Sequence, residues 1–369
     1  MSHPAKSTQA RRRSSSVGEP LSAQPTDQQH APRIVVDAAG GDGPLSIRVA
    51  GALSAARLYT DSRVFLCGAE LDLEREVQEL DGLPDNVTLV HAPEQIGMHE
   101  APVQALRTKK NSSIAIGIDM VAHGEADAFV SAGNTGAVAA ASTLKLGRLK
   151  GVHRPGIAAA MQVIDRPVVA IDVGANVDSR PVNLRQYGVM ANVFARDVLG
   201  IAQPRVGLLN VGSEAGKGNE LTRQVYALLS EADLNFVGNV EPEAIFQDGC
   251  DIVVCDGFTG NVLLKMGEGL TRRMIGWMRE RVRSNLKYIL GFALCKGLFK
   301  HLGKCSDYTE YGGAPLLGVN GVTIITHGAS GSRAIQNAIR EARSFVRHKV
   351  NARIEAAILA DAPSHGVRG

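Results

Sequence analysis

The sequence predicts an α/β protein built on a mostly parallel β-sheet with helices on both faces. Short runs of Val, Ile, Leu and Ala recur from Arg33 onward without polar alternation, and segments of helical length separate them. Such runs suit strands that are covered on both faces, which is the setting of a parallel sheet. Only 4% of the residues are aromatic and 40 are glycine. We therefore expect small side chains to do much of the packing between helices and sheet.

Ten of these runs are predicted to be strands, with helices between them. Good helix starts stand at Pro44, Pro181 and Pro242, because proline fits the first turn of a helix. A further helix of small residues is expected at 137–146. The predicted strands are 34–37, 64–67, 88–91, 128–131, 157–162, 168–172, 206–211, 235–238, 252–255 and 322–326.

The chain divides into a tail, one folded domain and a short C-terminal end. Residues 1–32 are rich in Ser, Gln and Pro and contain no apolar run, so we expect a disordered tail rather than a secretory signal. The folded domain is expected at 33–350, and the end of the last helix and a tail at 351–369. Five basic and two acidic residues within 1–33 account for the whole net charge of +3. The neutral body suggests no nucleic-acid partner.

The cysteines and the apolar runs bear on compartment. Five cysteines, without C-x-x-C or zinc-type spacing, argue against a disulfide framework or a structural metal. No apolar run approaches the roughly 18 residues of a membrane span. A reducing cytoplasm fits these features best.

The first candidate binding loop is the turn at 131–136, which lies between a predicted strand and a helix. Glycine lets the backbone approach a ligand, and the N–H groups of the first helical turn point at a negative group. An ordinary turn between strand and helix would have the same sequence. Its candidate residues are Gly133, Thr135 and Gly136 for binding and Asn134 for catalysis.

Two further elements have similar chemistry. The loop after the first strand contains Asp37, Gly40, Gly41 and Asp42, but its spacing is not G-x-G-x-x-G and no acidic residue closes the second strand, so a nicotinamide site is disfavoured. Its aspartates either orient loops and basic side chains or cap helices. Lys109 and Ser112 precede a helix and suit a phosphate, although a capped helix with solvated lysines is an equally simple explanation.

Glycine loops also follow strands in the second half of the chain. One contains Gly174 and Asn176, and the next contains Asn210, Gly212, Lys217, Gly218 and Asn219. The latter resembles a Walker A loop in part, but Val211 stands where its first glycine should be and Gly218 replaces the Ser or Thr, so an NTPase is disfavoured. Open α/β sheets bind ligands at the carboxyl ends of their strands.

The last loop contains Asp256, Gly257, Thr259 and Gly260, followed by Asn261 and Lys265 at i and i+4 on one helix face. A lone lysine there would be a solvated surface residue, whereas repetition across four loops favours a shared anionic site. We find no G-x-S-x-G elbow, no cysteine nucleophile motif and no His/Asp/Glu metal cluster. We expect no metal and no cofactor, and a substrate that is itself a nucleophile, such as inorganic phosphate.

With these loops in hand, the chain resembles the phosphate acyltransferases of bacterial phospholipid synthesis, the PlsX family, over roughly 33–350. It departs from the family at Ala39, where methionine is usual, and in its N-terminal tail. The resemblance rests on DAAGGDGP from Asp37, KKNSS from Lys109, GEADAFVSAGNTGA from Gly124, HRPGIAAAM from His153, DVGANVDSRPVNLRQYGVMANVFA from Asp172, PRVGLLNVGSEAGKGNE from Pro204, GNVEPEAIF from Gly238, CDIVVCDGFTGNVLLKMGEG from Cys250 and YGGAPLLGVNGVTIITHGAS from Tyr311.

The resemblance implies a catalytic domain that makes acyl phosphate from fatty acyl-(acyl carrier protein) and inorganic phosphate, for a membrane glycerol-3-phosphate acyltransferase. It also implies a homodimer with a three-layer α/β/α fold similar to isocitrate and isopropylmalate dehydrogenases. From loop chemistry we expect Asn134, Asn176, Asn219 and Asn261 to act as neutral donors and Lys217 and Lys265 as countercharges. A phosphotransacetylase-like enzyme acting on acyl-CoA and a membrane-surface scaffold are the alternatives.

The segment 270–304 breaks the pattern of short runs. It contains nine basic residues and only Glu280 as an acid, a net of +8, together with Trp277 and several apolar side chains. We predict two consecutive helical stretches that form a basic amphipathic segment in peripheral contact with an anionic bilayer. Packing at the dimer contact and reception of the acidic carrier protein are the other readings.

Overall fold

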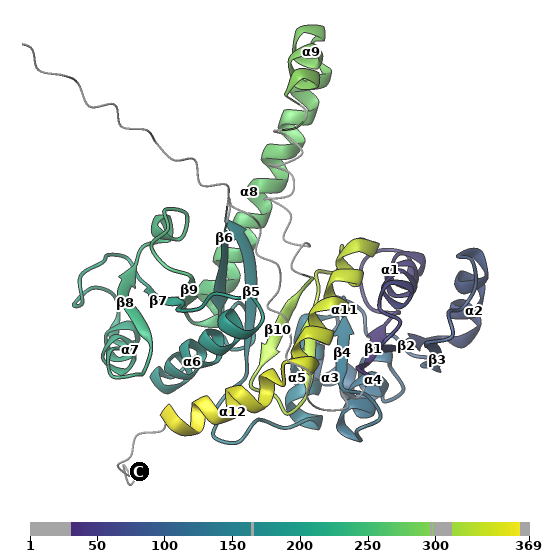
Figure 1. The fold of residues 1–369 in the computed structure, drawn as a ribbon, viewed down its shortest axis with the longest axis horizontal. Coiled ribbons are helices and arrows are strands. Elements are labelled where there is room, and N and C mark those ends of the chain that lie inside the picture. The colour runs from purple at the N-terminus through teal and green to yellow at the C-terminus, as the bar shows by residue number, and fades with distance from the viewer. Residues whose placement is uncertain (1–30, 164–165, 296, 298–311, 362–369) are drawn as a thin grey trace, which may run out of the picture.

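The structure is a computed structural model that describes residues 31–163, 166–295, 297 and 312–361 (Figure 1). Nearly all of the predicted N-terminal tail, the end of the segment 270–304 and the last residues of the chain lie outside the described residues. In the described part, eleven strands form one sheet in the order β3-β2-β1-β4-β11-β10-β5-β6-β9-β7-β8. All ten predicted strands are present within a few residues of their expected bounds.

The sheet has two halves whose strands run in opposite directions. The first half is parallel and comprises β1 (Arg33–Asp37), β2 (Arg63–Gly68), β3 (Val87–His91), β4 (Ala128–Ser131) and β11 (Val322–Ile325). The second half is also parallel and comprises β6 (Arg166–Ile171), β7 (Arg205–Leu209), β8 (Asn235–Val240) and β9 (Ile252–Val254). Antiparallel pairings of β10 (Ala314–Leu317) and β5 (Gly156–Val163) join the halves and reverse their direction.

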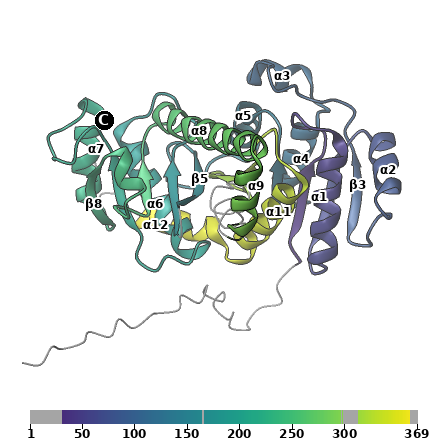
Figure 2. The same cartoon turned by 90° about the horizontal axis from the view of Figure 1, so that it is seen from above.

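Helices cover both faces, which confirms the three-layer α/β/α prediction (Figure 2). Alternate residues of β1 point to opposite faces: Ile34 and Val36 join one core, and Val35 joins the other. The first core is covered by α1 (Leu45–Leu58), α2 (Glu70–Glu79), α6 (Pro181–Asp197), α7 (Glu220–Ser230), α11 (Ser332–Arg347) and α12 (Val350–Asp361). The second is covered by α3 (Pro102–Thr108), α4 (Ser113–Ala122), α5 (Thr135–Lys145) and part of α8 (Gly257–Arg283).

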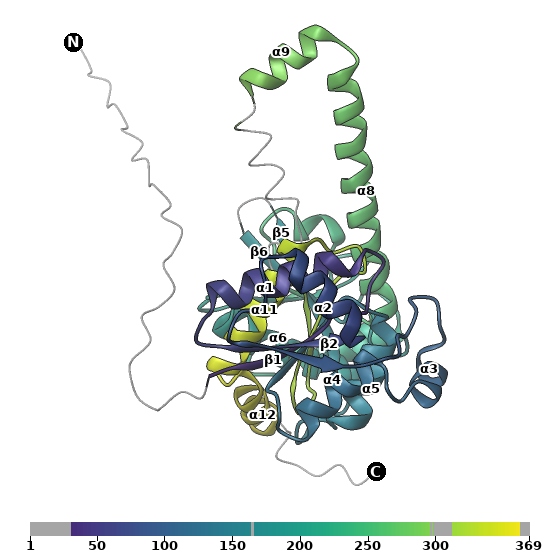
Figure 3. The ribbon, with the colours of Figure 1, turned by 90° about the vertical axis from the view of Figure 1, so that its right-hand side faces the viewer.

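Helix α8 leaves the body of the protein and leads to α9 (Leu286–Leu294), so that the two form a projecting arm (Figures 1 and 3). Of the residues of α8, Gly257 and Gly260 are buried. Large apolar side chains along the arm are exposed, among them Trp277 at 57% and Leu290 at 68%. These side chains are therefore not part of the core of this chain. No helix in the described residues is long and apolar enough to cross a bilayer.

Two local expectations were wrong. Strand β10 was missed because Ala314–Leu317 contains a proline, no β-branched residue and only four positions. Pro242 begins the short 3₁₀ helix η1 (Pro242–Ile245) rather than an α-helix, since the chain reaches the positive-φ residue Asp248 within one further turn.

Candidate active site

Three glycine turns interlock at the carboxyl ends of β1, β4 and β11, and we call residues 37–43, 131–136 and 326–330 the first loop group. A Cβ at Gly40 would lie 2.2 Å from Asp37 Oδ2 and 2.8 Å from the Cα of Gly133. The N–H of Asp42 donates to the carbonyl of Gly328 at 2.9 Å. The backbones of the turns are therefore in direct contact, and only glycine, which has no Cβ, fits at the points of contact.

Asp37 and Arg48 hold the turn at 37–43 in place through hydrogen bonds. The buried Asp37 carboxylate accepts hydrogen bonds from the N–H of Gly40 at 2.8 Å and the hydroxyl of Ser131 at 2.6 Å. Arg48, on α1, donates to the carbonyls of Ala38 at 2.5 Å and Gly43 at 2.9 Å. Burial lowers the pKa of Arg48, and the nearby carboxylates of Asp37 and Asp42 oppose that effect. Asp37 thus orients a loop, one of the two roles that the sequence left open.

Asn134 is occupied by structural contacts. Its Oδ1 accepts from the N–H of Ala137 at 3.0 Å and so caps α5, as expected for this residue type. Its Nδ2 lies within 3.0–3.2 Å of the carbonyls of Gly97, Met98 and Glu100. The N–H groups of Thr135 and Gly136 lie in the first turn of α5, where no intrahelical acceptor exists. These backbone groups, rather than the Asn134 amide, are the donors that the turn can offer to an anion.

Lys109 and Ser112 also have local partners. Lys109 forms an ion pair with Glu100 at 2.5 Å and donates to the carbonyl of Gln95 at 2.8 Å. The hydrogen bond from Lys109 lowers the pKa of Glu100. Ser112 caps α4 by accepting from the N–H of Ala115 at 3.3 Å. These contacts agree with the capped-helix explanation and fix the segment beside the first loop group.

A second loop group, residues 172–176 and 256–261, lies at the carboxyl ends of β6 and β9. Asp172 is buried and accepts from the N–H groups of Ile157, Gly174, Ala175 and Asn176 at 2.8–3.1 Å. Burial raises the pKa of Asp172, and the four N–H donors counteract this.

Two glycines bring α8 against this aspartate. A Cβ at Gly260 would lie 2.0 Å from the Asp172 carbonyl oxygen, and one at Gly257 would lie 2.7 Å from its Oδ2. Asp256 caps the helix by accepting from the N–H of Thr259 at 2.9 Å and its hydroxyl at 2.7 Å. These contacts seat the start of α8 against the second loop group.

The Asn176 amide is likewise engaged. Its Nδ2 donates to the carbonyl of Pro155 at 2.6 Å and to the hydroxyl of Tyr187 at 2.9 Å, and its Oδ1 accepts from Arg154 at 3.4 Å. Arg154 is exposed and was missed by the sequence reasoning, although it stands in one of the long motifs. It adds a cation beside the second loop group.

One face of α8 bridges the two loop groups. Asn261 lies against Gly174, where a Cβ would be 3.7 Å from Asn261 Oδ1, and Glu268 Oε2 lies 3.7 Å from His327 Nε2. Asn261, Lys265 and Glu268 are i, i+4 and i+7, so they share that face over a rise of roughly 10 Å. Asn261 and Lys265 are exposed and make no hydrogen bond or ion pair with any described residue. Lys265 thus lies between the groups as a cation whose ammonium has no partner among the described residues.

The loop 210–219 is separate from both groups. Asn210 donates to the carbonyl of Lys217 at 3.1 Å, Asn219 caps α7, and Lys217 lies 3.9 Å from Glu214. Gly218 has φ +91° and packs against Asn210, and Gly212 packs against Lys217. Within the described residues no hydrogen bond or ion pair connects this loop to either group. The structure therefore brings the predicted loops together as two pairs, 37–43 with 131–136 and 172–176 with 256–261, and leaves the loop 210–219 apart from both.

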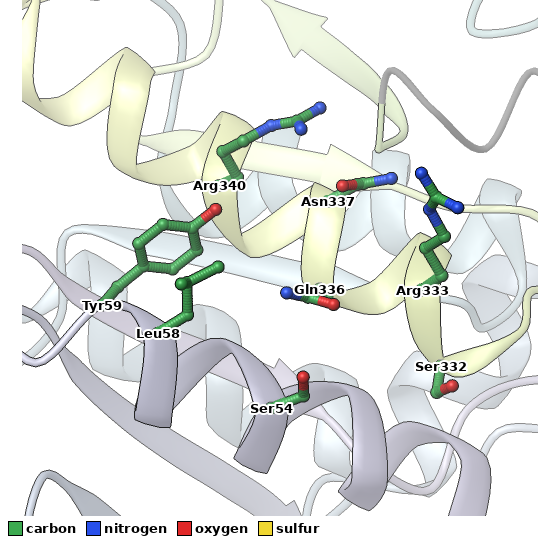
Figure 4. Close-up of a pocket in the computed structure, with 8 residues that line it drawn as sticks. All are labelled: Ser54, Leu58, Tyr59, Ser332, Arg333, Gln336, Asn337 and Arg340. Carbon is green, nitrogen blue, oxygen red and sulfur yellow. The ribbon is translucent and has the colours of Figure 1, made fainter.

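A groove of about 420 Å³ lies between α1 and α11 (Figure 4). Tyr59, Arg333 and Arg340 are among its lining residues, and none of the candidate residues lines it. We therefore place the candidate site at the two loop groups and the α8 face between them. Sequence reasoning missed Arg48, Glu268 and His327, since each is a single charged or titratable residue whose partner is distant in sequence.

Comparison with known proteins identifies the family to which this sequence is similar. The family model described as "Fatty acid synthesis protein" matches residues 32–353. Among curated proteins, the phosphate acyltransferase of Geobacter sulfurreducens is 45% identical over 87% of this chain and 93% of its own length. That of Halothermothrix orenii is 45% identical over 86% of this chain and 96% of its own length.

Solved structures show a similar fold at low sequence identity. The EutD phosphotransacetylase of Staphylococcus aureus aligns with a TM-score of 0.55 and 13% identity, covering 86% of this chain and 95% of its own. A phosphotransacetylase of Streptococcus pyogenes aligns with a TM-score of 0.56 and 15% identity, with the same two coverages. At such identities the likeness concerns the fold.

Proposed function

This chain belongs to the family of phosphate acyltransferases, and we propose that it makes acyl phosphate from fatty acyl-(acyl carrier protein) and inorganic phosphate. The observation that carries the choice of site is the N-terminus of α5 at the centre of three interlocked glycine turns. Such a helix start, with N–H groups aimed outward, suits a phosphate. The free carrier protein is the second product.

The chemistry needs positioning more than acid–base catalysis. A phosphate oxygen attacks the thioester carbonyl carbon, the C–O bond forms, and the C–S bond then breaks with its electron pair leaving on sulfur. Phosphate is anionic at neutral pH, so no general base must remove a proton first. A thiol with a reference pKa of about 8.5 leaves readily as thiolate. The site must hold phosphate against the thioester and stabilise the oxyanion.

The described residues divide these tasks as follows. The N–H groups of Thr135 and Gly136 bind phosphate, and Lys265 supplies positive charge from the neighbouring face of α8. Asn261, which has no hydrogen-bond partner in the described chain, donates to the oxyanion. Asn134 and Asn176 do not contact the substrate in this scheme. Their amides donate to backbone carbonyls and so hold the binding turns in place.

The arm formed by α8 and α9 is proposed to bind the membrane surface. Acyl phosphate has an apolar tail, and the enzyme proposed to consume it, a glycerol-3-phosphate acyltransferase, is in the bilayer. Exposed Tyr288, Leu290 and Phe292 on α9 follow exposed arginines on α8, which suits peripheral contact with anionic lipid. We place the protein in the cytoplasm with this arm at the membrane surface. The alternative is that the acidic carrier protein binds the basic residues of the arm.

A second copy of this chain is proposed to cover the lower part of α8. Phe258, Val262, Met266 and Leu270 are all exposed and succeed one another at i+4. A row of this kind is one ridge of a helix–helix contact. The proposed homodimer would bury it, and sedimentation equilibrium of the purified chain measures that state directly.

The activity is tested by incubating purified protein with acyl-carrier protein, with and without inorganic phosphate, and measuring acyl phosphate by mass. We expect consumption only when phosphate is present. Acyl-CoA in place of the carrier protein tests the phosphotransacetylase-like alternative. The proposal would be wrong if acyl-carrier protein were consumed without phosphate, or if the enzyme turned over acyl-CoA but not acyl-carrier protein.

A further inference from the structure

Glu268 and His327 connect two parts of the protein that the chain keeps far apart. Glu268 lies on α8 about two turns beyond Asn261, and His327 follows β11 in the first loop group. Their Oε2 and Nε2 atoms are 3.7 Å apart, and their side chains are only 11% and 25% exposed. This seclusion contrasts with the rest of the arm, where charged side chains such as Arg272 and Glu280 are exposed.

The imidazole of His327 has a fixed orientation. Its Nδ1 accepts a hydrogen bond from the N–H of Ala329 at 3.1 Å. An imidazole that accepts at Nδ1 carries its proton at Nε2, the atom that faces Glu268. Nδ1 is thus engaged by the turn, and Nε2 faces the Glu268 carboxylate at 3.7 Å.

The turn that contains His327 is locked to the other two turns of the first loop group. The carbonyl of Gly328 accepts from Asp42 at 2.9 Å, and a Cβ at Gly328 would lie 2.5 Å from Asp42 Oδ2. The N–H of Thr326 donates to the carbonyl of Ser131 at 2.8 Å. A displacement of His327 would therefore move the backbone on both sides of the start of α5.

We propose that Glu268 and His327 are a positioning pair that couples the placement of α8 to the phosphate-binding turns. The inference rests on the proposed function, because it takes the first loop group as the phosphate site. When α8 is seated, the carboxylate holds the imidazole and the imidazole holds the turn at 326–330. The arm and the site then change position together.

The test compares Glu268→Ala and Glu268→Gln with Glu280→Gln, a matched loss of one carboxylate from an exposed position on the same helix. We expect Glu268→Ala to raise the KM for phosphate roughly fivefold, the scale of coupling between contacting residues, with kcat nearly unchanged. Glu268→Gln should recover part of the loss because it keeps an acceptor for Nε2–H. The double variant with His327→Ala should be no worse than either single variant.

Tryptophan fluorescence provides a readout that does not depend on turnover. Trp277, the only tryptophan of the chain, lies on α8 beyond Glu268. Titration with inorganic phosphate should change its emission in the wild type and in Glu280→Gln, and not in Glu268→Ala. An identical response in all three proteins, or additive losses in the double variant, would overturn the coupling. A wild type that responds to phosphate but forms no acyl phosphate would instead count against the proposed function.

Discussion

Replacement of Asn134 by alanine separates a structural role from a catalytic one. The side chain is 7% exposed, caps α5, and faces three carbonyls of the segment 97–100. Its amide has two hydrogens, so it satisfies two of those carbonyls at once. We therefore expect Asn134→Ala to lower the stability of the protein as well as its activity.

The magnitude follows from the bonds that are lost. Removal of an N-cap costs about 1 kcal/mol. Two neutral hydrogen bonds contribute about 1 kcal/mol each. The sum, roughly 3 kcal/mol, corresponds to a fall in Tm of about 4–5 °C for a domain of about 320 residues, because the entropy of unfolding is about 2.1 cal/mol/K per residue. Turnover should fall by roughly 10²-fold or more, the scale of a misplaced anion site.

Thermal denaturation and steady-state kinetics on the same preparations measure both effects. Asn134→Asp keeps the acceptor for Ala137 and loses the donors, so it should retain the cap contribution alone. Asn261→Ala is the matched control, because that amide is exposed and unpaired in the described residues; its stability should stay within about 0.5 kcal/mol of the wild type. If Asn134→Ala has the same Tm as the wild type but loses turnover, the amide acts on the substrate and our reasoning is wrong.

Lys265→Ala should lower turnover roughly 10²-fold without changing Tm, and unaltered kinetics would remove Lys265 from the site. Phosphate-dependent turnover should survive EDTA, since an anionic nucleophile needs no metal-activated water; loss on chelation and recovery with a divalent ion would contradict this. Burial raises the pKa of Glu341 well above its usual value, although Gly313 donates to it. The folded state therefore binds this proton more tightly than the unfolded chain does, and stability should fall as pH rises above about 4.3, by up to about 1.4 kcal/mol per unit. Glu341→Gln should flatten that dependence in urea denaturation, and parallel curves would refute it. Leu290→Glu with Phe292→Glu should weaken sedimentation with anionic liposomes without changing the oligomeric state of the protein, and undiminished binding would exclude apolar insertion.

The fold was largely predictable because its signals are local. Continuous apolar runs such as Val35 and its neighbours identify strands covered on both faces, whatever their partners. Strand direction is not local. The antiparallel pairings of β10 and β5 reverse the second half of the sheet, and nothing in the runs themselves encodes that reversal.

The site was predictable in chemistry and less so in roles. Glycine turns at strand ends were correctly located, yet an asparagine after such a turn satisfies either a ligand or the backbone, and Asn219 and Asn134 cap helices. The partner of Glu268 is 59 residues away at His327. Pairs of this kind arise from tertiary packing, so a single sequence gives no signal for them.

The position of β10 and β11 in the middle of the sheet has a consequence for synthesis on the ribosome. Strand β4 ends at Ser131, but its neighbour β11 begins at Val322, and β10 directly precedes it. At roughly 5–20 residues per second, the edge of β4 stays without its partner for about 10–40 s. Until then the nascent chain carries two partial sheets with open, aggregation-prone edges. Premature termination before residue 322 would leave those edges open permanently, so a chaperone that shields them has a defined interval in which to act.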